Sequence, residues 1–198
     1  MTARYIGFEG VEGAGKSTIV AQVAACLEAA GDEVVVVREP GGTPVGEEIR
    51  RLLLHSDDVT GWTEAALFAA ARAELVRRVV TPALERGAFV LSDRTLYSSL
   101  AYQGGARGLG VSAVRALNET VLGGVLPDIV ILLEVEPDVG FARETDRDRI
   151  GSEGLAFQRR VAQAYREIAA TDPAVRVVDA ARPQASVVAD VVTLLEAP

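Results

Sequence analysis

Short runs of apolar residues recur along the chain, each bounded by turn residues, and segments with helical spacing lie between them. The apolar runs fall at residues 4–9, 33–38, 88–92, 128–135 and 174–179. Runs of this length are typical of buried strands, and their alternation with helices predicts βα units. We therefore expect an α/β fold in which helices flank a five-stranded, mostly parallel sheet.

Three segments outside these runs have the apolar spacing or the composition of helices. Ile19, Val23 and Leu27 fall four residues apart, so one face of this first helix should pack on the sheet before Gly31 ends it. Residues 63–86 are rich in alanine and predict a long helix, with Pro82 in or near its last turns, where proline can kink it. A last apolar stripe predicts a C-terminal helix and consists of Val187, Val188, Val191, Val192 and Leu195.

Length and composition narrow the class of protein. With 198 residues, 49% of them apolar, the chain suits one packed domain over 1–198. The net charge of −8 argues against a nucleic-acid partner, because such binders usually present basic surfaces. No apolar run reaches the ~20 residues of a membrane span and no signal-peptide pattern opens the chain, so we expect a cytoplasmic protein without membrane contact.

Cys26 and His55 are the only cysteine and the only histidine, which excludes an internal disulfide and a Cys/His metal cluster. Cys26 falls on what the spacing predicts to be the buried face of the first helix, where it should serve packing. His55 follows an apolar run near a helix end, where a capping or surface role is expected.

The strongest chemical signal lies between the first strand and the first helix. This segment fits the pattern G-x-x-x-x-G-K-[ST] and reads Gly10-Val11-Glu12-Gly13-Ala14-Gly15-Lys16-Ser17. Glycines let the backbone wrap a phosphate, Lys16 can reach the β- and γ-phosphates as a catalytic cation, and the Ser17 hydroxyl can ligate Mg²⁺. We expect ATP with Mg²⁺ to bind at Gly10, Glu12, Gly13, Ala14, Gly15, Lys16, Ser17 and Thr18.

The motif leaves alternatives open. A glycine-rich turn that binds no nucleotide is one of them, and the loop alone does not separate kinases from GTPases, motors or partitioning ATPases. No guanine-reading Asn-Lys-x-Asp segment occurs, which argues against a GTPase.

Two further strand ends carry residues that select among these classes. Asp93 and Arg94 follow the strand at 88–92, and Arg38 ends the strand at 33–38. Ligands of open α/β folds bind at the carboxyl ends of strands, where Asp93 can support Mg²⁺ and the two arginines can grip the phosphate of a second substrate. A structural ion pair is the alternative for Asp93 and Arg94.

With these residues in place, the sequence resembles the thymidylate kinase family of nucleoside monophosphate kinases over nearly its whole length. The matching motifs keep the family's order and run from Glu9 to Thr18, Arg38 to Thr43, Phe68 to Arg72, Asp93 to Arg94 and Ala101 to Gly108. The resemblance implies a three-layer P-loop NTPase fold and a homodimer that phosphorylates dTMP to dTDP with ATP in thymidine nucleotide synthesis. The alternatives are a kinase for another nucleoside monophosphate or a deoxynucleoside, and a non-catalytic P-loop ATP switch.

The resemblance also assigns the side chains around the base. It implies that Phe68 stacks on the thymine ring, that Arg72 with Ser99 or Gln103 reads its polar edge, and that Tyr102 lies against the deoxyribose. Without the resemblance, Phe68 and Arg72 would be the core and surface residues of an amphipathic helix. Tyr102 and Gln103 would then belong to a structural loop.

On the phosphate side, the resemblance makes Arg38 and Arg94 ligands of the acceptor phosphate and places Glu12 near the acceptor sugar and phosphate. Many relatives carry Asp at the position of Glu12. Tyr165, on the helix after the charged segment, either approaches the acceptor or simply packs.

The chain departs from the family pattern at two places. No basic residue occupies positions 11–14, and relatives of this kind supply the catalytic arginine from a lid, here about residues 143–154, with Arg147 and Arg149 as candidates. A solvated charged face is the alternative for these arginines. Thr95 stands where relatives more often carry Tyr or His, which leaves the hydrogen bonds on the base side open.

Overall fold

The computed structural model describes residues 4–56, 59–144 and 148–196. These residues form a five-stranded sheet in the order β2-β3-β1-β4-β5, in which every paired strand is parallel to its neighbour. The strands are β1 (Tyr5–Glu9), β2 (Val34–Arg38), β3 (Phe89–Asp93), β4 (Ile129–Glu134) and β5 (Val175–Asp179). The predicted α/β fold and its five strands are therefore confirmed, with each strand end within one residue of its predicted place.

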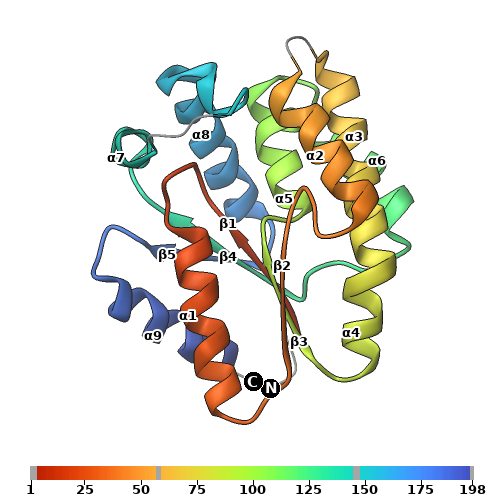
Figure 1. The fold of residues 1–198 in the computed structure, drawn as a ribbon. Helices are drawn as coiled ribbons and strands as arrows, with labels where there is room; N and C mark the ends of the chain where they lie inside the picture. Colours follow the sequence, from red (N-terminus) through yellow and green to blue (C-terminus); the bar gives the residue numbers. More distant parts are fainter. Residues whose placement is uncertain (1–3, 57–58, 145–147, 197–198) are drawn as a thin grey trace.

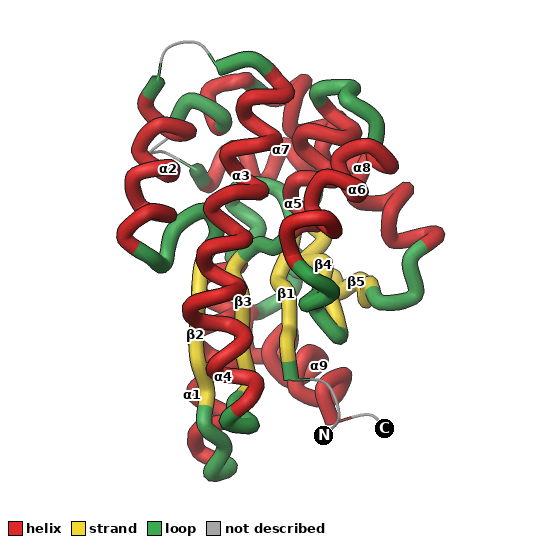
Figure 2. Tube along the Cα trace, turned by 90° about the vertical axis from the view of Figure 1, so that its right-hand side faces the viewer, coloured by secondary structure: helices red, strands yellow, loops and turns green. Residues whose placement is uncertain are grey.

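Helices flank both faces of this sheet (Figures 1 and 2). Helix α1 packs against α9, helix α4 contacts strand β3, and helix α8 contacts strand β5. The α-helices are α1 (Lys16–Ala29), α2 (Pro44–His55), α3 (Gly61–Leu75), α4 (Thr81–Glu85), α5 (Leu96–Ser99), α6 (Val111–Leu122), α7 (Pro137–Arg143), α8 (Leu155–Thr171) and α9 (Gln184–Glu196). None of the helices in the described ranges is long and apolar enough to cross a membrane.

The long helix expected over 63–86 is interrupted by a change of helix type. Helix α3 passes into a five-residue π-helix, η1 (Val76–Val80), and then into α4. Pro82 in the first turn of α4 has no N–H for the α-helical ladder, and its ring crowds the carbonyl of Arg78 four residues earlier. The wider π turn of η1 includes Arg78, whose carbonyl is the one crowded by this ring.

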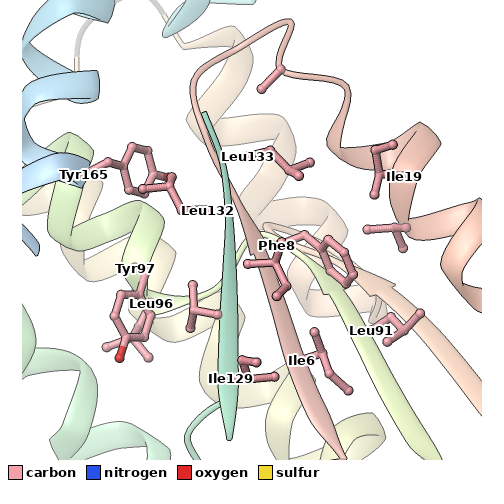
Figure 3. Packing of buried hydrophobic residues seen from close by; sticks show 14 of the residues in the cluster. Ile6, Phe8, Ile19, Leu91, Leu96, Tyr97, Ile129, Leu132, Leu133 and Tyr165 are labelled. Carbon is pink, nitrogen blue, oxygen red and sulfur yellow. The ribbon is translucent and has the colours of Figure 1, made fainter. Parts of the chain in front are cut away.

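The core of the sheet consists of side chains from strands that are buried on both faces. Ile6 and Phe8 of β1 have no exposed surface and lie beside Leu91 and Leu133 of the neighbouring strands (Figure 3). Burial on both faces explains why the central strands appear as continuous apolar runs in the sequence.

The predicted helical stripes lie in this core, with one exception. Ile19, Val23 and Leu27 of α1 are buried, as are most residues of the stripe in α9. The prediction that Cys26 is buried was wrong, because Cys26 is exposed. At about 100° per residue, Cys26 falls at the rim of the stripe rather than at its centre, where Val23 and Leu27 lie. His55 is exposed and ends α2, as expected.

Candidate active site

A cavity of about 420 Å³ opens at the carboxyl edge of the sheet. It collects side chains from the loop after β1, the ends of β2 and β3, helices α2 and α3, the segment after α5, and the segment after α7. Most of the predicted site residues line it, namely Glu12, Gly13, Gly15, Lys16, Ser17, Thr18, Arg38, Phe68, Asp93, Arg94, Ser99, Tyr102 and Gln103. Gly10, Ala14, Arg72, Arg149 and Tyr165 are outside that lining.

The phosphate-binding loop has the backbone that its glycines predict. Gly13 and Gly15 have φ angles of 71° and 87°, in the left-handed region that glycine adopts without strain. Gly15 is the N-cap of α1 and offers no side-chain cap, so the first N–H groups of the helix remain available to an anion.

The loop also lies against α7 with no side chain in between. A Cβ atom on Gly13 would be 2.0 Å from the carbonyl oxygen of Gly140, and one on Gly140 would be 2.4 Å from the carbonyl oxygen of Glu12. Both distances are far below contact separation, so glycine is required on both sides of this contact.

Lys16 is buried and folded onto its own loop. Its Nζ donates hydrogen bonds to the carbonyl oxygens of Gly10 at 3.1 Å and Val11 at 2.9 Å. Burial lowers the pKa of Lys16 to about 8, and the charge of Arg94 adds to that effect. A nearby phosphate would favour the charged form again.

Ser17 and Asp93 form the pair of oxygen ligands expected for a magnesium ion. The Ser17 hydroxyl donates to Oδ2 of Asp93 across 2.5 Å, which joins the start of α1 to the end of β3. Hydroxyl and carboxylate oxygens suit Mg²⁺, which usually keeps several waters and takes one or two protein ligands. The described side chains include no cluster of three or more His, Cys, Asp or Glu that could enclose a metal. The oxygens of Ser17 and Asp93 have the chemistry that fits Mg²⁺.

Arg94 has a left-handed backbone conformation that is rare for a residue with a side chain. Its φ is 76°. Two hydrogen bonds hold this conformation: the backbone N–H of Arg94 donates to the carbonyl of Phe8 at 3.0 Å, and its carbonyl accepts from the hydroxyl of Ser92 at 2.6 Å. The guanidinium lies over the ring of Tyr102 at 5.2 Å and donates to Ser98 at 3.2 Å. The strained backbone thus directs a cation into the cavity.

Two more arginines line the cavity near Arg94. Arg38 is largely exposed and pairs with Glu47 at 3.3 Å. Arg50 donates to the carbonyl of Pro40 at 2.8 Å, and burial together with the charge of Arg38 lowers its pKa. Sequence reasoning missed Arg50, because nothing in the pattern of α2 separates it from the neighbouring exposed Arg51.

Glu12 also lines the cavity. Burial raises the pKa of Glu12 above its usual range, while Arg94 opposes that shift. Its expected place near the acceptor sugar and phosphate stays a prediction.

Arg72 is 2% exposed and is held by four groups of the protein. Its Nε donates to Glu39 at 2.5 Å and its Nη2 to the carbonyl of Thr95 at 2.9 Å. Its Nη1 donates to Ser99 at 3.2 Å and also to Asn118. Four of the five N–H groups are used in this way, and Arg72 does not line the cavity.

Glu39, the partner of Arg72, was not predicted as a site residue. It lines the cavity, it is 5% exposed, and burial raises its pKa against the opposing effect of Arg72. Its Oε1 has no hydrogen-bond partner in the described parts of the chain.

The residues expected around the sugar and base lie together on one wall. Phe68 of α3 is partly buried, and Ser99, Tyr102 and Gln103 come from the end of α5 and from the π-helix η2 (Leu100–Ala106). The buried hydroxyl of Tyr102 has no hydrogen-bond partner among the described residues. A polar atom in that state is prepared to meet a ligand or water.

Tyr165 belongs to a buried hydrogen-bond network rather than to the cavity wall. Its hydroxyl donates to Glu9 at 2.6 Å, and Glu9 also accepts from the backbone and side chains of Thr95 and Ser98. Sequence reasoning missed Glu9 and Ser98. The only signal was the position of Glu9 at the end of β1.

The lid candidates differ in what the structure describes. Arg147 lies outside the described residues. Arg149 donates to the carbonyl of Leu53 at 2.9 Å and pairs with the buried Glu64 at 2.7 Å. Its guanidinium therefore points to α2 and α3, while the nearby Asp148 and Ile150 line the cavity.

Comparison with known proteins gives one consistent match. The family model described as thymidylate kinase matches residues 8–191. A thymidylate kinase of Thermomicrobium roseum is 50% identical over 193 residues, which cover 95% of this chain and 91% of the relative. Thymidylate kinases of Kosmotoga olearia and Bifidobacterium longum are 47% and 46% identical, and the matches cover 83% and 92% of those proteins.

Proposed function

Since the chain belongs to the thymidylate kinase family and phosphorylates dTMP to dTDP, we propose that the transfer takes place in the cavity at the carboxyl edge of the sheet. The observation that carries this proposal is the position of Arg94. Its guanidinium lies in the same cavity as the phosphate-binding loop and the wall formed by Phe68 and Tyr102.

On the donor side, the loop amides, the N-terminus of α1 and Lys16 bind the phosphates of ATP. Lys16 leaves the carbonyls of Gly10 and Val11 and turns to the phosphates, because they offer full negative charge. Ser17 and Asp93 would hold Mg²⁺, which supplies positive charge to the β- and γ-phosphates when it is bound.

On the acceptor side, Arg94 and Arg38 bind the 5′-phosphate of dTMP, and we add Arg50 to this set. Arg50 lines the cavity and is held in place by the carbonyl of Pro40. Three guanidinium groups give the acceptor phosphate several bidentate partners. The attacking oxygen is already anionic at neutral pH, so the residues act by positioning and charge neutralisation and no strong general base is required.

The nucleoside of dTMP lies on the wall formed by α3 and η2. Phe68 stacks on the base, and Ser99 or Gln103 contacts its polar edge. Arg72 does not line the cavity and supports this wall through its hydrogen bond to Ser99. Tyr102 lies against the deoxyribose. We propose that Tyr165 acts through Glu9 and Ser98, which position Arg94, rather than through contact with the acceptor.

The two predicted lid arginines then take different roles. The guanidinium of Arg149 is committed to Glu64 and Leu53, so we propose that it fastens the lid segment to α2 and α3. Arg147 remains the candidate that contacts the transferring phosphate. A closed lid excludes water and limits hydrolysis of ATP.

The test is a coupled assay of ADP release with dTMP, dUMP, dCMP, dGMP, UMP and AMP as acceptors. We expect release that depends on the acceptor and is fastest with dTMP. Release that is independent of every acceptor, or fastest with a cytidine or purine nucleotide, would contradict the proposal.

The variant Arg94→Ala tests the acceptor site independently of the donor site. The variant should lose transfer by a factor of about 10³ or more, as expected when a cation at a transferring phosphate is removed, and should still bind ATP. Arg159→Ala is the matched control, because Arg159 forms an exposed pair with Asp138 on the surface. Normal transfer by Arg94→Ala would show that the acceptor site lies elsewhere.

We also propose that the protein is a homodimer. Helices α2, α3 and α6 pack side by side and carry large exposed apolar side chains, namely Val45, Leu52, Trp62 and Val121. Exposed apolar side chains on neighbouring helices support an interface between two copies. The cytoplasmic location stays a prediction.

A further inference from the structure

Glu64 is a fully buried carboxylate that does not line the cavity and yet accepts hydrogen bonds from three side chains around it. Arg107 donates to both of its oxygens, at 2.6 and 3.0 Å, and Arg149 donates to Oε2 at 2.7 Å. The third donor is the amide of Gln103, whose Nε2 lies 2.8 Å from Oε1. The bonded nitrogen of each of these groups carries hydrogen and can only donate, so both carboxylate oxygens act as acceptors.

This arrangement fixes the orientation of the Gln103 side chain. Oε1 of Glu64 already accepts from Arg107 and acts as an acceptor, so Gln103 turns its NH₂ group to Glu64. The carbonyl Oε1 of the same amide then points the other way. Gln103 lines the cavity, and its Oε1 has no hydrogen-bond partner within the described ranges.

An acceptor held at this position distinguishes between pyrimidines. Thymine and uracil carry an N–H donor at N3, whereas N3 of cytosine is an acceptor. A fixed Oε1 would accept the hydrogen bond from the first two bases and would face another acceptor in cytosine. A site built around a buried polar group rejects the mismatched ligand more strongly than an apolar pocket does.

We propose that Glu64 is a positioning residue for base recognition, because it holds the Gln103 amide with its carbonyl towards the N3–H group of the acceptor base. The inference rests on the proposed function, since it assigns Gln103 to the base. Arg107 and Arg149 both pair with Glu64, and Arg149 comes from the lid segment, so base recognition and the attachment of the lid share one carboxylate.

The experiment compares kcat/KM for dTMP, dUMP and dCMP in the wild-type protein and in Glu64→Gln. The neutral amide at position 64 can donate as well as accept, so Gln103 becomes free to turn over. We expect the ratio of dTMP to dCMP to fall by about tenfold or more. The ratio of dTMP to dUMP should stay unchanged, because both bases carry the N3–H group.

A structural role alone would lower kcat/KM for all three nucleotides alike and leave both ratios unchanged, and that result would overturn the proposal. Glu153→Gln is the matched control. It removes a carboxylate that pairs with the same Arg107 at 2.8 Å but does not contact Gln103. Its ratio of dTMP to dCMP should equal the wild-type value, whatever happens to the rate. A wild-type protein inactive on dTMP would instead contradict the proposed function.

If Glu64→Gln does not fold, Glu64→Asp tests the same point, because it keeps a carboxylate beside the two arginines but shortens the side chain that reaches Gln103. The ratio of dTMP to dCMP should again fall. If neither variant folds, the side-chain amide protons of Gln103 can be followed by nuclear magnetic resonance in the wild-type protein. Slow exchange with solvent is expected for an N–H bound to a buried carboxylate. Fast exchange would overturn the proposal.

Discussion

Thr95 shows how one residue outside the cavity can set the geometry inside it. Its backbone N–H and hydroxyl both donate to Glu9, at 2.7 and 2.8 Å, and its carbonyl accepts from Arg72. Its Oγ1 also accepts the N–H of Tyr97 and caps the start of α5. Thr95 thus fixes the chain directly after Arg94 and explains why a small hydroxyl residue suits this position.

Thr95→Val should therefore destabilise the protein by about 1–3 kcal/mol, since it removes a cap and a buried donor at constant shape. The KM for dTMP should rise, because Arg94 is less well held. Chemical denaturation and steady-state kinetics measure the two effects. Thr95→Ser keeps the hydroxyl and should retain most of the stability and the KM of the wild type. Equal losses in both variants would contradict this role of the hydroxyl.

Lys16 should make ATP binding dependent on pH. Its pKa of about 8 in the ligand-free protein lies below the ordinary value, so at pH 9 it is mostly neutral and at pH 7 it is charged. Bound phosphates favour the charged form. ATP binding at pH 9 should therefore take up close to one more proton than binding at pH 7.

Titration calorimetry in two buffers of different ionisation enthalpy measures this uptake at each pH. Lys16→Arg is the control, because arginine stays charged at both values. Equal proton uptake by the wild type at pH 7 and pH 9 would show that Lys16 does not titrate in this range.

The cavity position of the loop around Lys16 and of the pair Asp93 and Arg94 could be predicted from sequence, because they belong to a local motif or to a strand end. Arg50 could not, because nothing in its neighbourhood in the chain marks it. Glu9 and Glu64 could not be predicted, because their partners lie far away in the sequence. Glu64 meets Gln103 across 39 positions and Arg149 across 85.

At the scale of elements, the segment after α7 is fastened to α2 and α3 through Arg149. Arg149→Met should loosen this attachment. We expect kcat for transfer to dTMP to fall by about tenfold and ATP hydrolysis without acceptor to rise several-fold, because water reaches the phosphates. Phosphate release in the absence of dTMP measures the second effect.

Arg159→Met removes an exposed arginine of α8 and serves as the control. A loss of transfer beyond about 10³-fold without added hydrolysis would indicate that Arg149 itself contacts the transferring group. In that case its pairing with Glu64 would be a feature of the ligand-free protein alone.

The strands could be predicted almost to the residue, because each apolar run ends abruptly at turn residues. The helix types could not be predicted. The π-helix η1 lies where Pro82 crowds the preceding turn and η2 packs against α8, and the apolar pattern encodes neither feature. Since η2 carries Tyr102 and Gln103, this irregular backbone decides where the base-side residues point.

For the whole molecule, the proposed dimer predicts a mass of roughly twice 20.9 kDa in sedimentation equilibrium. Trp62→Glu should shift the protein to the monomer, since it puts a charge into the apolar surface of α3. Val177→Glu, on an equally exposed position of β5, should leave the dimer intact. A wild-type monomer at micromolar concentration would contradict the proposal, and the single domain over 1–198 stays a prediction.

The contact between Gly13 and Gly140 has a mechanical consequence for the whole molecule. Two backbones that touch directly leave no layer of side chains that could be compressed or could change rotamer between them. A displacement of the loop towards α7 would therefore have to move the backbone of α7 as well, because no side chain between them can yield.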